Sequence, residues 1–407
     1  MNASTANPFQ RSVRYLTGWA GRSRINAALV SVASVLAGLL VGAVLIAATD
    51  PDVQKSASYF FGRPSDFFHY VGSSVGGAYS TLFQGSVYNF RATGFAAGIR
   101  PLTETLTFAA PLTVAGLGVA VAFRAGMFNI GGRGQILFGA AASGWVGFAF
   151  HLPPGLHLIV ALVAGMAAGA LWGALSGGLK ALTGAHEVIT TIMLNFVAFY
   201  LVSYLLKTPG ALQAPGSNNP ETPDMLPTAL LPRLFGDQYS INAGFLIALL
   251  ATLAVWIVLE RSTAGFRFRV VGENPNAARV AGIRVERTYV WVMALSGALV
   301  GLAGVIQVLG NVRTGFGSGI DAGIGFDAIT VALLGRSRAG GVLAAGILFG
   351  ALKAGGLSMQ AVNGIDVNIS AVVQAMIVLL IAAPPLVRKL FRIPKPTAEA
   401  TLQGARS

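Results

Sequence analysis

The sequence predicts an all-α, polytopic membrane protein with about ten transmembrane helices and with both the N- and C-termini in the cytoplasm. Of its 407 residues, 54% are apolar and a further 52 are glycine, whereas only 11% are charged. Soluble domains carry about 25% charged residues. The apolar residues form runs of about 20, the length that a helix needs to cross a bilayer. The 28 Lys and Arg residues lie in short clusters between these runs, a pattern typical of membrane proteins.

Ten segments are apolar enough to be membrane spans, although two of them are short and rich in glycine. In chain order they are Ile25–Ala48, Thr105–Phe123, Ile136–His151, Leu156–Leu179, Val188–Leu206, Ile241–Leu259, Tyr289–Gly310, Gly323–Gly335, Gly341–Gly355 and Val367–Val387. The first run is long for a signal peptide and many spans follow it, so we expect an uncleaved helix.

The distribution of positive charge sets the expected orientation. With the N-terminus inside and alternating spans, the inner segments hold 20 of the 28 Lys and Arg residues, as the positive-inside rule requires. This predicts a cytoplasmic tail over residues 1–24, a transmembrane domain over 25–388 and a cytoplasmic tail over 389–407. External loops are expected at about 49–104 and 207–240, and a large inner loop at 260–288.

Several kinds of chemistry are excluded by what the sequence lacks. It has no cysteine, which excludes disulfides and Cys-ligated metals. It has neither a phosphate-binding G-x-x-x-x-G-K-[ST] loop nor an H-E-x-x-H zinc motif. We therefore predict no catalytic residue and no metal site. The predicted spans are nearly free of charge: Glu104, Asp321 and Asp327 lie near outer ends and Lys353 near the end of a short segment, where interfacial roles are expected. Energy must then come from a partner, or the protein is a passive pore.

A regular glycine stripe marks one predicted helix. The glycines recur every four residues, so they share one face and let a neighbouring backbone approach closely. They are Gly165, Gly169, Gly173 and Gly177. The stripe predicts dense helix packing.

Two polar segments interrupt the apolar runs. Phe128–Gln135 contains Asn129 and three glycines, a sequence that does not favour a helix and that suits either a gate lining a water-filled cavity or a cytoplasmic turn. In the second segment, Thr191 and Asn195 are four residues apart and share a helix face, where an asparagine can bond across helices.

A third segment, Gly272–Ile283, lies in the large inner loop. Asn274 is expected to cap a short helix that has Pro275 at its first position and Gly282 as its stop. Ala277, Ala278 and Ala281 give the helix small side chains. A short preformed helix on the cytoplasmic surface suits a docking element for another protein.

Together these segments resemble bacterial ABC importer permease subunits of the branched-chain-amino-acid/simple-sugar permease superfamily, and within it the nucleoside/simple-sugar branch. The resemblance covers about residues 25–388. Four motifs in this order carry it: Ala122–Gly131, Thr190–Asn195, Gly272–Ile283 and Gly325–Gly335. Arg133 departs from the pattern, because a small or acidic residue is more usual in that stretch.

The resemblance implies a permease subunit in the bacterial cytoplasmic membrane that works with several partners and is not itself an enzyme. These partners are a second related permease subunit, two ATP-binding cassette subunits and an extracellular substrate-binding protein, often a lipoprotein. The only other partner is membrane lipid; no nucleic acid is expected. ATP and Mg would be bound by the partner subunits, and no cofactor by this chain. The residues that would couple to the ATPase are Glu273, Asn274, Pro275, Ala277, Ala278, Arg279 and Gly282.

For the cargo, the resemblance favours nucleosides. A nucleoside is uncharged and polar, and Phe128, Asn129, Gln135 and Asn195 are the residues predicted to line its path. Two alternatives stay open at this point. The same machinery could import a simple sugar or a branched-chain amino acid, or the chain could be an ATP-independent secondary carrier or channel.

Overall fold

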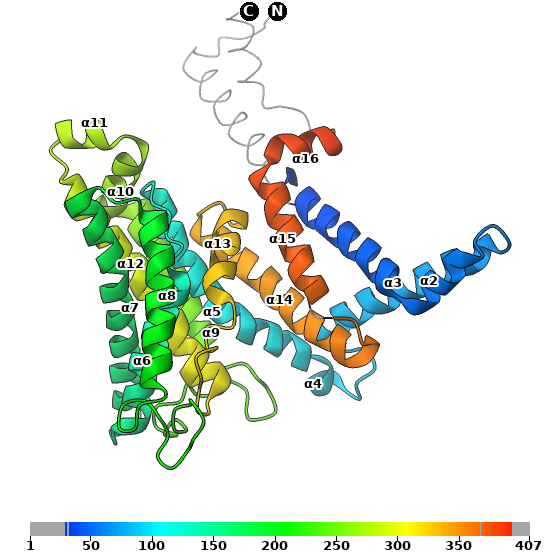
Figure 1. Cartoon of the computed structure of the whole chain (residues 1–407), viewed down its shortest axis with the longest axis horizontal. Coiled ribbons are helices and arrows are strands. Elements are labelled where there is room, and N and C mark those ends of the chain that lie inside the picture. The colour runs from blue at the N-terminus through cyan, green and yellow to red at the C-terminus, as the bar shows by residue number, and fades with distance from the viewer. Residues whose placement is uncertain (1–28, 31, 367, 393–407) are drawn as a thin grey trace, which may run out of the picture. The chain divides into compact units, whose positions relative to one another are not determined.

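The computed structural model describes residues 29–30, 32–366 and 368–392, and within them the chain is helical (Figure 1). No strand forms in this part of the chain, apart from an isolated bridge between Arg233 and Asn242. The contacts divide the chain into two compact units, one of residues 1–76 and 366–407 and the other of residues 77–365. The two predicted cytoplasmic tails, 1–24 and 389–407, lie outside the described residues except for the first four residues of the second.

Among the described residues, seven helices are long and apolar enough to cross a membrane, which agrees with seven of the ten predicted spans. They are Val32–Thr49, Phe95–Arg124, Leu156–Thr183, Glu187–Leu205, Gly244–Arg261, Val285–Val312 and Ala339–Asn363. The other three predicted spans correspond to shorter or less apolar helices, α6 (Gly132–Ala149), α13 (Ile324–Leu334) and α15 (Asn368–Ala382). The protein is therefore a multi-pass membrane protein, while the number ten and the side of the termini remain predictions.

The larger unit is built around α5 (Arg100–Arg124) and α12 (Val285–Ile306), whose residues are mostly buried. Around them lie α6, α7 (Leu156–Thr183), α8 (Glu187–Leu205), α9 (Gly244–Arg261), α13 and α14 (Ala339–Asn363). A six-residue π-helical turn, η1 (Gln307–Val312), continues α12. Figure 1 shows α7 and α12 side by side.

The predicted glycine stripe of α7 lies against α12. A Cβ atom on Gly169 would lie 2.7 Å from Gly301 Cα, and one on Gly173 would lie 3.1 Å from Gly297 Cα. Gly165 and Gly177 meet Val305 and Val290 of the same helix. The two backbones are thus close enough that no side chain fits between them. In lipid, where apolar burial does not drive helices together, such backbone packing is a main source of stability.

The smaller unit contains the helix over Val32–Thr49, α2 (Pro51–Ser58), the first part of α3 (Pro64–Ser86), α15 and α16 (Pro384–Leu390). Gly38 packs against Ile377 of α15. Asp50 accepts hydrogen bonds from the amides of Asp52 and Val53 at the start of α2. Burial raises the pKa of the Asp50 carboxyl, but hydrogen bonds from Ser74 and these amides outweigh it and lower the pKa overall.

Polar contacts tie together turns that the charge rule assigns to one side. Arg124, at the end of α5, donates to the carbonyl of Ser337 at 3.0 Å and pairs with Glu260 at 2.9 Å. At the opposite end of the same helices, the amide of Phe316 donates to Thr222 Oγ1 at 3.0 Å. Predicted inner turns therefore meet at Arg124, and the predicted external loop 207–240 contacts the segment that follows η1.

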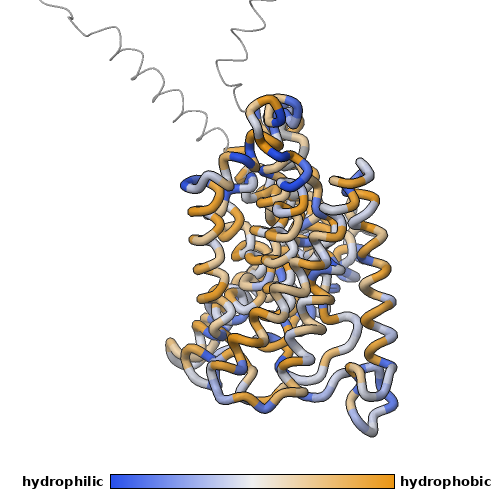
Figure 2. Tube along the Cα trace, turned by 90° about the vertical axis from the view of Figure 1, so that its left-hand side faces the viewer, coloured by the Kyte–Doolittle hydropathy of each residue, from blue (hydrophilic) through white to orange (hydrophobic). Residues whose placement is uncertain are grey.

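Hydropathy follows the helices. In Figure 2 the orange, hydrophobic residues run along the helices, and blue residues gather at turns and helix ends. Large apolar residues such as Leu171, Tyr200 and Leu250 are 67–70% exposed in the isolated chain. Surfaces of this kind suit contact with lipid or with a partner subunit.

Candidate functional site

The polar segment after α5 folds back into the bundle. Residues Met127–Ile130 are not helical, and α6 begins only at Gly132. A Cβ on Gly132 would meet the backbone of Gly325 at the start of α13, with Gly325 Cα at 3.1 Å. The segment is therefore packed against helices, and both interpretations, a gate lining a cavity and a plain cytoplasmic turn, stay predictions.

Asn129 holds this segment in place and is itself fully buried. Its amide nitrogen donates to Ser296 Oγ on α12 at 2.8 Å and to Gln135 Oε1 at 2.9 Å. Its amide oxygen accepts from Gly131 N at 3.0 Å and from Gln135 Nε2 at 3.1 Å. Ser296 Oγ in turn donates to the carbonyl of Gly118 on α5 at 2.7 Å. A closed network of this kind satisfies backbone groups that have no helical partner.

Asn195 bonds to the same segment from α8. Its oxygen accepts from Gly134 N at 2.8 Å, and its nitrogen donates to the carbonyl of Ile130 at 2.9 Å. About two turns earlier on α8, Glu187 Oε1 accepts from the amide of Phe128 at 3.4 Å and Oε2 pairs with Lys180. Side chains of α8 thus hold the backbone of this segment through hydrogen bonds, in addition to the network around Asn129.

The structure brings together three of the four predicted path residues. Asn129, Gln135 and Asn195 are buried and bonded to protein groups, whereas Phe128 is 53% exposed and packs against the ring of Phe123 at 5.2 Å. In this conformation the amides of the three polar residues are used by the protein itself. Their role in the path stays a prediction.

Two charged side chains lie on helices whose lengths differ from the predicted segments. Helix α13 has 11 residues and is therefore about 16 Å long, shorter than a hydrocarbon core of about 30 Å. Asp327 lies in its first turn. Lys353 lies in the middle of α14, because that helix extends to Asn363 rather than ending near Gly355. Interfacial roles for these two residues stay predictions.

These charges face one another in pairs. Arg133 Nε lies 3.4 Å from Asp321 Oδ1, and its guanidinium lies 4.5 Å from the centre of the Phe199 ring. Lys353 Nζ donates to the carbonyl of Ala322 at 3.1 Å and interacts electrostatically with Asp327 and Asp321. Paired charges are the form in which ionisable groups are tolerated inside a membrane protein.

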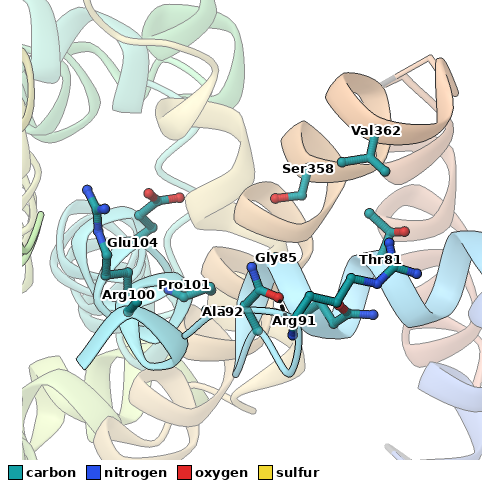
Figure 3. A pocket seen from close by; sticks show the side chains of 12 residues that line it. Thr81, Gly85, Arg91, Ala92, Arg100, Pro101, Glu104, Ser358 and Val362 are labelled. Carbon is teal, nitrogen blue, oxygen red and sulfur yellow. Dashed lines mark hydrogen bonds between the residues drawn. The ribbon is translucent and has the colours of Figure 1, made fainter. Parts of the chain in front are cut away.

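A pocket of about 410 Å³ opens at the outer end of α5, between α3, α4 (Phe95–Gly98) and α14. Figure 3 shows Arg100 and Glu104 of α5 on one side, with Ser358 and Val362 of α14 and Thr81 of α3 across from them. Its lining residues are Thr81, Gln84, Gly85, Asn89, Arg91, Ala92, Ala97, Arg100, Pro101, Glu104, Ser358 and Val362. Most of these carry hydrogen-bonding groups, which suits a polar ligand.

The inner loop folds as two short helices, α10 (Thr263–Glu273) and α11 (Pro275–Val280). The Asn274 side chain accepts from the amides of Asn276 at 3.0 Å and Ala277 at 3.1 Å, and Gly282 has a φ of 79°. The cap, the proline and the stop all lie where the sequence predicts them. Glu273 ends α10 rather than beginning α11.

One alanine anchors α11 and the rest of its surface is exposed. Ala278 is fully buried in a small core with Val271 and Val285. By contrast, Val280 is 91% exposed. Arg279 donates a hydrogen bond to the Glu286 carboxylate at 2.7 Å, and this bond holds the pKa of Arg279 above its ordinary value. The loop therefore has its own rigid core and presents an apolar side chain away from it.

No group of three or more His, Asp or Glu side chains lies close enough to hold a metal ion in the described part of the chain. The functional features are thus a buried polar segment, paired charges, an outer pocket and a preformed inner helix.

Residues 102–382 match the sequence profile of the family described as "Branched-chain amino acid transport system / permease component". The chain belongs to this family. It is 34% identical over 369 residues to the guanosine ABC transporter permease protein NupP of Bacillus subtilis, covering 90% of this chain and 96% of that one.

Two further relatives are named for different cargoes. The glucose ABC transporter permease protein TsgB13 of Haloferax volcanii is 36% identical over 289 residues, covering 69% of this chain and 75% of that one. The nucleoside ABC transporter permease protein NupB of Lactococcus lactis is 33% identical over 307 residues, covering 74% and 83%.

Sequence reasoning missed the charge pairs and the outer pocket. The pairs join residues that are far apart in the chain, as with Arg133 and Asp321. The pocket draws on four helices and a loop and has no motif of its own. The one signal in the sequence was the set of isolated charges in apolar surroundings, Glu104, Asp327 and Lys353, which the predicted segment boundaries had assigned to helix ends.

Proposed function

We propose that this chain is the membrane-spanning permease subunit of an ATP-driven importer for nucleosides in the bacterial cytoplasmic membrane. The observation that carries this proposal is the 34% identity to a guanosine permease over 90% of the chain. A glucose permease of similar identity covers less of the chain, 69%. A nucleoside is therefore the preferred cargo, ahead of a simple sugar or a branched-chain amino acid.

In this proposal the α10–α11 loop receives the movement of an ATP-binding subunit. Its core of Val271, Ala278 and Val285 makes it stiff enough to transmit force, and the exposed Val280 offers an apolar contact to a partner groove. The Arg279–Glu286 pair fixes α11 to the start of α12. Because α12 carries Ser296, a tilt of this helix would act directly on the Asn129 network.

The partners in the proposal are a second related permease subunit, two ATP-binding subunits and an external binding protein. ATP and Mg would be bound and hydrolysed on the partner subunits. This chain itself would bind no cofactor. It would supply the path of the solute and the α10–α11 loop that receives the movement of the ATP-binding subunit. Residues Glu273 to Gly282, with Asn274, Pro275, Ala277, Ala278 and Arg279 among them, would form the contact with the ATPase.

The test compares two exposed apolar residues on different loops. Val280→Glu places a charge on α11, and Leu182→Glu places the same charge at the end of α7, where Leu182 is 88% exposed. We expect Val280→Glu to abolish ATP-dependent guanosine uptake and co-purification of the ATP-binding subunits, with normal membrane levels. Leu182→Glu should retain both.

Co-purification and uptake at the wild-type level in the Val280→Glu complex would refute the role of α11. Absence of guanosine uptake by the wild-type complex would refute the cargo.

A further inference from the structure

The outer pocket has the size and lining of a binding site for a small polar molecule. Its volume of about 410 Å³ lies within the range of about 300–1,000 Å³ for small-molecule pockets. Arg100 and Glu104 of α5 interact electrostatically at its edge, and Ser358 faces them from α14 (Figure 3). The pocket thus offers cationic, anionic and neutral hydrogen-bonding groups within one space.

Beyond the pocket, further side chains follow along one face of α5. Glu104 and Phe108 are four residues apart, so they are neighbours on the helix surface. Lys353 Nζ of α14 lies 5.7 Å from the centre of the Phe108 ring. The same ammonium donates to the carbonyl of Ala322, next to Asp321. Glu104, Phe108, Lys353 and the Ala322 carbonyl therefore follow one another, each near enough for a side chain to reach the next.

The far end of this line is the Arg133 pair. Asp321 lies 3.4 Å from Arg133, whose guanidinium lies over the Phe199 ring of α8. The backbones of Gly132 and Gly325 touch at this level. The line from Glu104 to Arg133 therefore reaches the segment that Asn129 and Asn195 hold in place.

The groups lie at different positions along their helices. At 1.5 Å per residue, Glu104 lies about 30 Å and Phe108 about 24 Å from Arg124 at the end of α5. Lys353 lies about 21 Å from Ala339 at the start of α14, and Asp327 about 10 Å from Leu334 at the end of α13.

Charges of both signs occur along this line. Arg91, Arg100, Lys353 and Arg133 are cations, and Glu104, Asp321 and Asp327 are anions. Together they offer donors and acceptors to hydroxyl and amide groups. The rings of Phe108 and Phe199 add flat apolar surfaces at two levels. Ionisable groups are costly in a membrane protein, and those that occur mark solute pathways.

We propose that this line of side chains, from the outer pocket past Phe108 and Lys353 to Arg133, is the route by which the chain passes a neutral, polar solute that carries a flat ring. This inference rests on the proposed function and adds to it the place where the cargo first binds and the residues it then meets. The route lies beside the Asn129 network, whose opening would admit the solute to the inner side.

Because the chain has no cysteine, an introduced cysteine is its single thiol, and labelling of that thiol tests the route directly. Ser358→Cys places one thiol in the pocket, and Asp237→Cys places one in the external loop, at a side chain that is fully exposed. The complete transporter is treated from outside with a charged, membrane-impermeant thiol reagent. We expect the reagent to block most of the guanosine uptake of Ser358→Cys relative to the same variant untreated, and guanosine to slow the modification at least fivefold. Asp237→Cys should react without either effect.

A second variant separates a role in the route from a structural one. Lys353→Gln removes the charge and shortens the side chain by one atom, with Lys207→Gln as the matched control at an exposed lysine. The external binding protein is unchanged, so any change in selectivity arises in the permease. We expect the ratio of guanosine to 2′-deoxyguanosine uptake to change at least threefold in Lys353→Gln and to stay constant in Lys207→Gln. An equal fall for both solutes would indicate only a structural role.

The outcomes distinguish the two proposals. If the wild-type complex imports guanosine but modification of Ser358→Cys neither blocks uptake nor is slowed by guanosine, and Lys353→Gln keeps its selectivity, the route is overturned and the proposed function stands. If the wild-type complex does not import guanosine, the proposed function fails and the nucleoside route fails with it.

Discussion

An alanine at Gly169 tests the packing of α7 on α12. The added Cβ would lie 2.7 Å from Gly301 Cα and 2.9 Å from Gly301 N. Non-bonded carbon contacts are optimal at about 3.5–4.0 Å, so the two helices must separate by about 1 Å. Overpacking of this kind costs about 1–3 kcal/mol. The clash is with backbone atoms, which cannot turn away as a side chain could, so we expect the upper half of this range.

The control lies on the same helix. Gly178 has no heavy atom within 4 Å of an added Cβ, and alanine is favoured over glycine in a helix by about 0.5–1 kcal/mol. Gly178→Ala should therefore be neutral or slightly stabilising. The assay is the temperature at which half of the detergent-purified protein is lost from its monodisperse peak. Equal loss temperatures for Gly169→Ala and Gly178→Ala would refute the close approach of the two backbones.

Two other substitutions address the buried network and the inner loop. Asn129→Leu removes the partners of Gln135 and Ser296 and should destabilise the protein by about 1–3 kcal/mol for each polar group left unpaired, measured by the same thermal assay, whereas Asn276→Leu at an exposed position should have little effect. Ala278→Leu overfills the core of the inner loop at a cost of about 1–3 kcal/mol and should speed tryptic cleavage of the Arg-rich loop, whereas Ala277→Leu, which points outward, should not.

The features that could be predicted from the sequence are those decided within one segment. The long apolar runs, the cap at Asn274, the stop at Gly282 and the α7 stripe each depend on residues a few positions apart, so local rules suffice. The structure places all of them as expected.

The features that could not be predicted depend on helix lengths and on distant partners. The apolar segment Gly323–Gly335 resembles a span, but α13 has only the 11 residues Ile324–Leu334, and the cation that interacts with Asp327 comes from α14. Likewise, no local rule pairs Arg133 with Asp321 or tells that Asn129 finds its partner in Ser296. Such pairs depend on how the helices pack, and helix packing cannot be derived from a single sequence by local rules.

The charge pairs also help to decide whether transport is driven by an ion gradient or by ATP. A near absence of charge in the spans was the sequence argument against an ion-coupled carrier, and the carboxylates of Asp321 and Asp327 weaken it. Each of these carboxylates faces a cation, Arg133 or Lys353, however. A carboxylate paired in this way is a poor site for a coupling proton or sodium ion, because binding the ion would leave the buried cation unpaired. The exposed α11 helix, in contrast, has no use in a carrier that works alone.

Reconstitution of the complete transporter decides between the two mechanisms. With equal pH and equal sodium on both sides of the vesicle, we expect guanosine uptake in the presence of ATP on the side of the α10–α11 loop, and none without it. An imposed pH or sodium gradient should neither replace ATP nor change the rate by more than about twofold. Uptake driven by a gradient in the absence of ATP would refute the ATP-driven mechanism. The chain would then be an ion-coupled carrier, with Asp321 or Asp327 as the residue that binds the coupling ion.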